Sequence, residues 1–196
     1  QMTNLAKALS SGKNIRAIGV DDAPFENARG SRVNVSGIIC AGTRFEGMLW
    51  DQVSKDGSNA TDVLCDMILH SKFYPQLHLV LLDGIAVGGF NIIRLQAMQR
   101  RLNLPCIAVM RKPPNLDAID KALKCFEDYA ERVAAIREAG PVIEKGGFVY
   151  QVAGAEAGEA LAALEKLTDT GKVPEALRLA HIIGAAIMTG ESSSRA

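Results

Sequence analysis

Hydrophobic and polar positions alternate along the first third of the chain, which is the period of β-strands. The pattern is clearest in residues 32–42, where apolar residues occupy every second position and predict a half-buried strand. Similar segments lie at residues 15–24 and 44–57, and the latter closes on the turn dipeptide Asp56-Gly57. The links between the three segments are short, so we expect antiparallel neighbours.

From residue 60 onward the period changes, and helical spacing alternates with short apolar runs. Runs bounded by turn residues predict buried strands, and longer amphipathic stretches predict helices. The expected order is helix 60–73, strand 77–83, helix 90–103, strand 105–111, a long helix 115–140, a hairpin 141–154, and helices 155–168 and 174–188.

This order predicts an α/β fold. Three meandering strands followed by two strand–helix units give a mixed five-stranded sheet with helices on both faces, because the later strands pair in parallel through right-handed crossovers. That arrangement is the ribonuclease H-like architecture. We expect residues 15–196 to form a single domain and the polar residues 1–14 to be a disordered lead-in. The fold hosts many activities and does not decide the function.

Composition narrows the class of protein. The 196 residues are 48% hydrophobic and 22% charged, as in a globular protein, and 22 basic residues balance 22 acidic ones. No global basic field therefore indicates a nucleic-acid partner, although a local patch could serve. The four cysteines include no CxxC pair and predict free thiols. We find no signal-peptide or membrane-span pattern and expect a cytoplasmic protein.

Two aspartates end strands that should be neighbours in the sheet. Asp21 follows the first apolar run, and Asp83 ends the fourth. Parallel strands present their carboxyl ends to one crevice, and two adjacent carboxylates repel unless a cation lies between them. Mg²⁺ or Mn²⁺ suits such a pair and can activate water for phosphodiester cleavage. The alternative is that each aspartate caps a turn through nearby amides.

A third acid is harder to choose. Asp56 ends the third strand and is our candidate, although the Asp-Gly turn alone explains it nearly as well. Asp22 and Glu46 are held in reserve, and Glu46 lies near the start of its strand and should point away from the crevice.

Several other residues should surround this crevice. Arg111 and Lys112 leave the fifth strand and could contact phosphate. His181 lies alone in the last helix, where a structural role is the usual alternative. The glycines after Asp83 would let a substrate backbone approach closely; they are Gly84, Gly88 and Gly89.

Five ordered motifs carry a resemblance: "IGVDDAPF", "SKDGSNATD", "LLDGIAVGGFN", "AVMRKPP" and "VPEALRLAHIIGAA". From about Ile15 onward the chain resembles the mostly archaeal endonuclease dU family, which is distantly similar to endonuclease V, a Mg²⁺-dependent nuclease that cuts near deaminated bases. The resemblance implies an endonuclease V-like fold and assigns roles by position. Asp21, Asp56 and Asp83 match metal acids and Arg111 a basic residue, and a later segment matches Pro174, Glu175, Arg178 and His181.

The sequence departs from endonuclease V at Asp56, where glutamate is usual, and at Arg111, where lysine is usual, and one further departure matters more. Residues 45–52 read "FEGMLWDQ", without the prolines of its strand-separating wedge, so inosine recognition is not implied. We predict a metal-dependent endonuclease acting on deaminated, perhaps uracil-containing, DNA or RNA. An extruded base could stack on Trp50 or Phe90, although either could instead be core. The alternatives are a non-catalytic nucleic-acid-binding module on this fold and, less favoured because a second lobe is missing, an actin-like nucleotide binder.

Overall fold

The centre of the molecule is a twisted mixed sheet of seven strands in the order β3-β2-β1-β4-β7-β9-β8. The computed structural model describes residues 2–28 and 30–193. β1, β4 and β7 run parallel to one another, and every other pair in the sheet is antiparallel. The strands are β1 (Arg16–Asp22), β2 (Arg32–Ala41), β3 (Arg44–Ser54), β4 (Leu79–Asp83), β7 (Cys106–Met110), β8 (Ile143–Lys145) and β9 (Phe148–Ala153).

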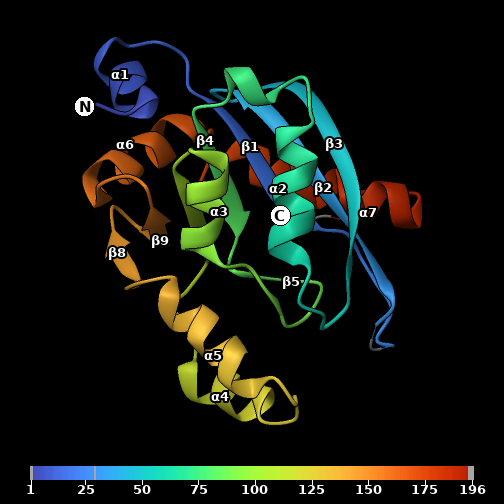
Figure 1. Ribbon diagram of the computed structural model, residues 1–196. Helices are drawn as coiled ribbons and strands as arrows, with labels where there is room; N and C mark the ends of the chain where they lie inside the picture. The colour runs from blue at the N-terminus through green and yellow to red at the C-terminus, as the bar shows by residue number, and fades with distance from the viewer. Residues whose placement is uncertain (1, 29, 194–196) are drawn as a thin grey trace.

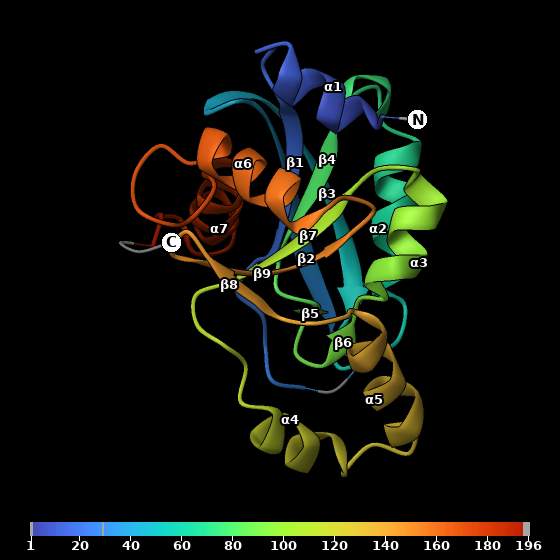
Figure 2. The same cartoon turned by 90° about the vertical axis from the view of Figure 1, so that its left-hand side faces the viewer.

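Helices cover both faces of this sheet (Figure 1). The view in Figure 2 separates them, with α6 and α7 on one side of the strands and α2 and α3 on the other. Each face has its own buried apolar cluster, because successive strand residues point to opposite faces. The helices are α1 (Asn4–Ser10), α2 (Ala60–Leu69), α3 (Leu95–Leu102), α4 (Leu116–Leu123), α5 (Tyr129–Glu138), α6 (Ala157–Leu167) and α7 (Glu175–Thr189), with a 3-10 turn η1 (Tyr74–Gln76).

The sheet is larger than the alternation of elements predicts. The expected α/β class and mixed pairing are confirmed, but the sheet has seven strands rather than five. The two additional strands are the predicted hairpin, whose β9 pairs antiparallel to β7 from Cys106↔Ala153 to Met110↔Val149. Its apolar residues Phe148 and Tyr150 are buried, so the hairpin extends the core instead of standing apart from it.

The helix expected over residues 115–140 is divided in two. α4 ends at Leu123 and α5 begins at Tyr129. Between them Phe126 turns inward and packs edge-to-face on Phe90, with ring centroids 6.0 Å apart. The two short helices form a lobe beside the end of the sheet (Figures 1 and 2), which we call the α4–α5 lobe.

Two smaller expectations also differ from the structure. Residues 1–14 were expected to be a disordered lead-in, but α1 forms there with Leu5 fully buried and a side-chain cap from Thr3. Residue 1 lies outside the described residues. The helix expected from residue 90 begins only at Leu95, because the preceding residues form a small hairpin of β5 (Ala86–Val87) and β6 (Asn91–Ile92).

Across residues 2–28 and 30–193, we find no helix with the length and apolar character needed to cross a membrane.

Candidate active site

Asp21 and Asp83 lie side by side at the carboxyl ends of two adjacent parallel strands. In the register of β1 and β4, Val20 pairs with Leu82, so the next residue of each strand is an aspartate. Strand alternation turns both side chains toward the α7 face, where Leu81 already belongs to the buried cluster beneath α6 and α7. The sequence thus places two carboxylates on the same face of the sheet, at the carboxyl ends of two neighbouring strands.

Helix α7 packs directly over this part of β1. Gly19 makes the close approach possible, because a Cβ added there would stand 2.6 Å from the backbone carbon of Ala176. Further along, Ser36 Oγ donates a hydrogen bond to the Ala180 carbonyl at 3.0 Å. These contacts set the position of His181, whose Nδ1 lies 3.1 Å from Asp21 Oδ2.

The electrostatics of the pair are unfavourable without a cation. The Asp21 side chain is only 8% exposed. Burial, followed by the neighbouring carboxylates of Asp83 and Asp22, raises the pKa of Asp21 to about 8. Asp83 is exposed but close enough for a hydrogen bond to Asp21 when one of the two is protonated. Within the described part of the chain, neither carboxylate is ion-paired with a lysine or arginine.

The pair opens into a small cavity with cations at its rim. The walls come from the ends of β4 and β7, from α7 and from the loop before α7. The lining residues are Asp21, Asp83, Val109, Met110, Arg111, Lys172, Val173, Leu177 and His181. Arg111 was expected there, but sequence reasoning missed Lys172. It lies in the link between α6 and α7, and the only sequence signal is its position two residues before Pro174. Lys112 is exposed and does not line the cavity.

Asp56 does not join this cluster. Its backbone has φ 53°, and its carboxylate accepts hydrogen bonds from Lys55 Nζ at 2.7 Å and from the Phe90 amide at 2.9 Å. Burial opposes its ionisation, but these donors together with the charge of Arg132 lower the pKa of Asp56. The structure therefore supplies Asp56 with partners that stabilise its charge within a turn, and it does not line the cavity of Asp21 and Asp83.

The two reserve acids have different surroundings. Burial raises the pKa of Asp22, although the Gly88 amide that donates to its Oδ2 at 2.7 Å opposes the shift. Asp22 thus ties the loop after β4 to β1. Glu46 accepts from Arg16 Nε at 2.9 Å. Arg16 begins β1 whereas Asp21 lies near its end, so Glu46 belongs to the opposite end of the sheet.

Of the remaining candidate residues, some have structural contacts and one leaves open space beside Asp83. Glu175 and Arg178 form an ion pair at 2.5 Å within α7, and neither lines the cavity. Gly88 packs against Val33, and a Cβ added at Gly89 would stand 2.2 Å from Asp56 Oδ1, so both glycines serve loop packing. Gly84 has φ 71° and open space around it, as close approach of a ligand requires.

The donor set suits a hard divalent cation that keeps part of its water shell. Within the described residues, no three histidine, cysteine, aspartate or glutamate side chains are grouped to enclose a metal ion. Mg²⁺ is usually bound by one or two carboxylates, with water and substrate phosphate completing its shell. Asp21 and Asp83 meet that requirement. Neighbouring arginine and lysine side chains suit a phosphate at the same place.

Comparison with known proteins identifies the family. The model of the family described as endonuclease dU matches residues 13–188. The chain belongs to the endonuclease dU family. A UPF0215 protein of Methanosarcina barkeri is 38% identical over 187 residues, which are 93% of this chain and 95% of the relative. Another, from Pyrococcus horikoshii, is 39% identical over 185 residues, covering 92% and 95%.

Solved structures confirm the expected fold class for this endonuclease dU family member. A protein of unknown function from Archaeoglobus fulgidus, 32% identical, has a TM-score of 0.84 and covers 88% of this chain and 98% of its own. Endonuclease V of Bacillus subtilis has a TM-score of 0.59 at 11% identity, covering 94% and 89%. At that identity the likeness shows the ribonuclease H-like fold alone.

Proposed function

We propose that this chain is a metal-dependent endonuclease that cuts DNA or RNA near a deaminated base. The observation that carries the proposal is the pairing of Asp21 with Asp83: two carboxylates on adjacent parallel strands, one of them buried, with no lysine or arginine ion-paired to either among residues 2–28 and 30–193. In the metal-free protein the two carboxylates repel each other and destabilise the fold. A cation bound between them removes this repulsion. Sites with perturbed carboxylates in a cavity are candidates for catalysis.

Five polar residues that line the cavity have a defined part in this proposal. Asp21 and Asp83 would hold Mg²⁺ or Mn²⁺, which when bound would supply an activated water and stabilise the leaving oxygen. His181 places Nδ1 against Asp21, so with Asp21 ionised Nδ1–H donates and Nε2 is left to accept or return a proton. Its side chain is 40% exposed, so a substrate could reach the imidazole ring. Arg111 would orient the phosphate, and Lys172 would join it if its Nζ left the Gly146 carbonyl, to which it donates at 2.9 Å.

The deaminated substrate is supported by relatedness. Endonuclease V of Ciona intestinalis has been solved in complex with DNA containing an inosine followed by a ribo-adenosine, and its TM-score to this chain is 0.51 at 14% identity. The endonuclease dU family name points to deoxyuridine. We therefore extend the proposal to uracil and hypoxanthine as the bases that direct cleavage.

One experiment tests the proposal as a whole. End-labelled oligonucleotides, single-stranded and duplex, would carry one uracil, hypoxanthine or cytosine and be incubated with Mg²⁺, Mn²⁺ or EDTA. We expect cleavage near the deaminated base with either metal and none with EDTA or with Asp83→Asn. Salt-sensitive binding without cleavage in any metal would instead identify a non-catalytic binding module.

A further inference from the structure

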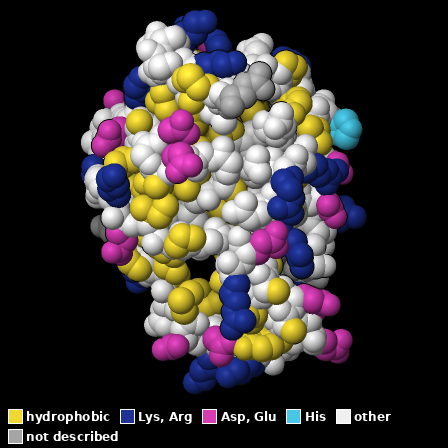
Figure 3. All heavy atoms as spheres, turned by 60° about the vertical axis from the view of Figure 1, so that its left-hand side comes forward, with side chains coloured by type: hydrophobic (Ala, Val, Ile, Leu, Met, Phe, Trp, Pro, Cys, Tyr) yellow, Lys and Arg dark blue, Asp and Glu magenta, His cyan; other side chains and the backbone are white. Residues whose placement is uncertain are grey.

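A second cavity, of about 490 Å³, lies between the body of the molecule and the α4–α5 lobe. Figure 3 shows a hollow where the lower lobe meets the body, with hydrophobic side chains around it. The apolar lining comes mainly from the loop after β4, the end of β7 and both helices of the lobe, and includes Ile85, Phe90, Ile92, Met110, Leu116 and Ile136. An apolar pocket with few polar groups is the usual form of a small-ligand site.

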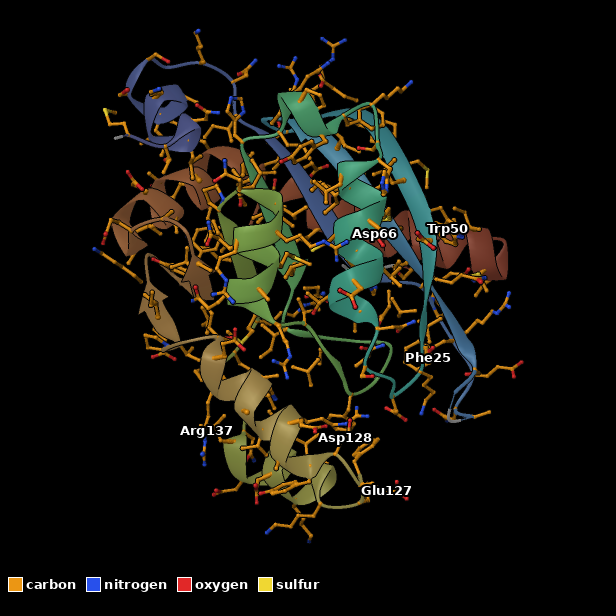
Figure 4. The ribbon with its side chains drawn as sticks, viewed as in Figure 1. Phe25, Trp50, Asp66, Glu127, Asp128 and Arg137 are labelled. Atoms are coloured by element: carbon orange, nitrogen blue, oxygen red, sulfur yellow. The ribbon has the colours of Figure 1, made fainter. Side chains whose placement is uncertain are left out.

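This cavity adjoins the candidate active site. Met110 lines both cavities, and the wall begins two residues after Asp83, at Ile85. Arg137 is among the lining residues, and Figure 4 shows its side chain on α5. A strand whose phosphate lies at Asp21 and Asp83 would therefore carry a neighbouring base past the mouth of the apolar cavity.

The walls are held in place by a buried arginine. Arg132, on α5, is 7% exposed and donates to the backbone carbonyls of Phe90 at 2.6 Å and Asp56 at 2.8 Å. The guanidinium also stacks on Phe126, with 4.1 Å to the ring centroid. These bonds join the lobe to the loop after β4, so the cavity is formed before any ligand arrives.

One buried amide reaches the cavity. Gln151, on β9, is 5% exposed and pairs with Ala108 on β7. Its Nε2 donates to the Gly140 carbonyl at 2.9 Å, and a carbonyl can only accept, so this bond fixes which end of the amide is nitrogen. Within the described residues no hydrogen bond to the Gln151 oxygen is found, so this oxygen is available as an acceptor in a cavity with mainly apolar walls.

We propose that this cavity binds a base extruded from the strand, and that the Gln151 amide oxygen accepts a hydrogen bond from its ring N–H. Deamination at C4 of cytosine or C6 of adenine converts the adjacent ring nitrogen from an acceptor into an N–H donor. A fixed acceptor in an apolar pocket thus favours uracil over cytosine and hypoxanthine over adenine, since the wrong base leaves two acceptors facing each other.

The same chemistry predicts which bases the pocket does not distinguish. Thymine also carries a ring N–H, and its methyl group fits an apolar wall, so an unpaired thymine should bind about as well as uracil. In a duplex, a mispaired deaminated base is extruded more easily than a paired thymine. The inference rests on the proposed nuclease function, because it takes the bound strand to lie across Asp21 and Asp83.

The test is equilibrium binding by fluorescence anisotropy in EDTA, where metal-dependent cleavage is suppressed. Four labelled single strands would differ only at one position: uracil, thymine, cytosine or an abasic site. Wild type should bind the uracil and thymine strands at least about 10-fold more tightly than the cytosine strand. Gln151→Leu should bring that ratio close to one, whereas Gln76→Leu, at an exposed glutamine of η1, should leave it unchanged.

A second variant avoids the buried position. Ala86→Trp changes an exposed residue at the cavity wall and should reduce uracil-strand affinity to that of the abasic strand, with the melting temperature preserved. A wild-type uracil-to-cytosine ratio of one, or a ratio that both variants leave intact, would overturn the inference. If wild type still cuts in Mg²⁺ in that case, the proposed nuclease function stands; if it neither binds nor cuts, both fail.

Discussion

Asp21 and Asp56 are both aspartates at the ends of strands in the same sheet, yet the protein treats their charges in opposite ways. Asp56 is 12% exposed and has an ammonium and a backbone amide on its carboxylate. Asp21 is 8% exposed and faces His181 and two further carboxylates. The pKa of Asp56 is lowered, whereas burial and the neighbouring Asp83 raise the pKa of Asp21 to about 8.

This difference separates a structural charge from a candidate functional one. A carboxylate with satisfied bonds stabilises the fold in the absence of ligands. A buried carboxylate beside another of like charge destabilises the fold until a cation arrives. We therefore assign Asp56 to the turn that it closes and propose Asp21, together with Asp83, as the ion site.

The largest expected effect is on cleavage. Asp21→Asn should lower Mg²⁺-dependent cleavage by at least about 100-fold, because the amide cannot supply the charge that the ion requires. Asp56→Asn should stay within about three-fold of wild type, since asparagine tolerates the positive φ and still accepts from the Phe90 amide. Single-turnover rates on a uracil-containing strand measure both. Equal losses in the two variants would erase the distinction between the sites.

Stability without metal should reverse that order. Asp56→Ala should lower the free energy of unfolding by about 1–3 kcal/mol, because it leaves the Lys55 ammonium and the Phe90 amide without their acceptor. Asp21→Asn should leave it unchanged or raise it, since a repulsive charge is removed. Urea unfolding in EDTA at pH 8 provides the values. An Asp21→Asn protein that unfolds more easily than Asp56→Ala would contradict the account.

The pH dependence of stability gives a third way to distinguish Asp21 from an aspartate with a purely structural role. Between about pH 4 and 8 folded Asp21 retains a proton that the unfolded chain has released, because burial raises its folded pKa to about 8. The free energy of unfolding of the metal-free protein should therefore fall as the pH rises through this window. Urea unfolding at pH 5, 6.5 and 8 should show a smaller fall for Asp21→Asn, and parallel curves for the two proteins would refute the assignment.

The sequence predicted the adjacency of Asp21 and Asp83 better than it predicted their surroundings. Apolar runs and their polar ends were enough to place Asp21 and Asp83 together, because two parallel strands in register bring their carboxyl ends to one edge. They could not reject Asp56, whose turn is held by Lys55 next to it and by Arg132, which is 76 residues away. An aspartate at the end of a strand looks the same in the sequence whatever its role. The residues that bind its carboxylate are known only from the fold.

The errors in the fold have a similar origin. The hairpin at 141–154 was recognised, but alternation does not encode which strand of the sheet a hairpin pairs with, so the pairing of β9 with β7 was not predicted. No glycine or proline marks the break between α4 and α5; the break follows from the packing of Phe126 on Phe90. Lys172 lies in a connection without periodicity, and only the return of α7 brings it to the cavity.

The smallest expected effect concerns the rim of the cavity. Arg111→Ala should weaken nucleic-acid binding a few-fold and reduce the slope of log affinity against log salt by about one, as the loss of a single phosphate contact predicts. Arg44→Ala is a matched control, because Arg44 lies with Arg16 and Glu46 at the other end of β1. Binding measured at four salt concentrations would show equal slopes for both variants if Arg111 did not meet phosphate.

The central claim is that Asp21 and Asp83 share a divalent ion, and thermal unfolding of Asp83→Asn with and without Mg²⁺ tests it most directly. Wild type should gain stability as Mg²⁺ is added, since a ligand that binds only the folded state stabilises it by mass action. Asp83→Asn should melt at or above the wild-type temperature in EDTA and gain little or nothing from Mg²⁺. Asp56→Asn should respond to Mg²⁺ as wild type does. An Asp83→Asn protein that melts lower in EDTA and still gains the full Mg²⁺ stabilisation would contradict the claim.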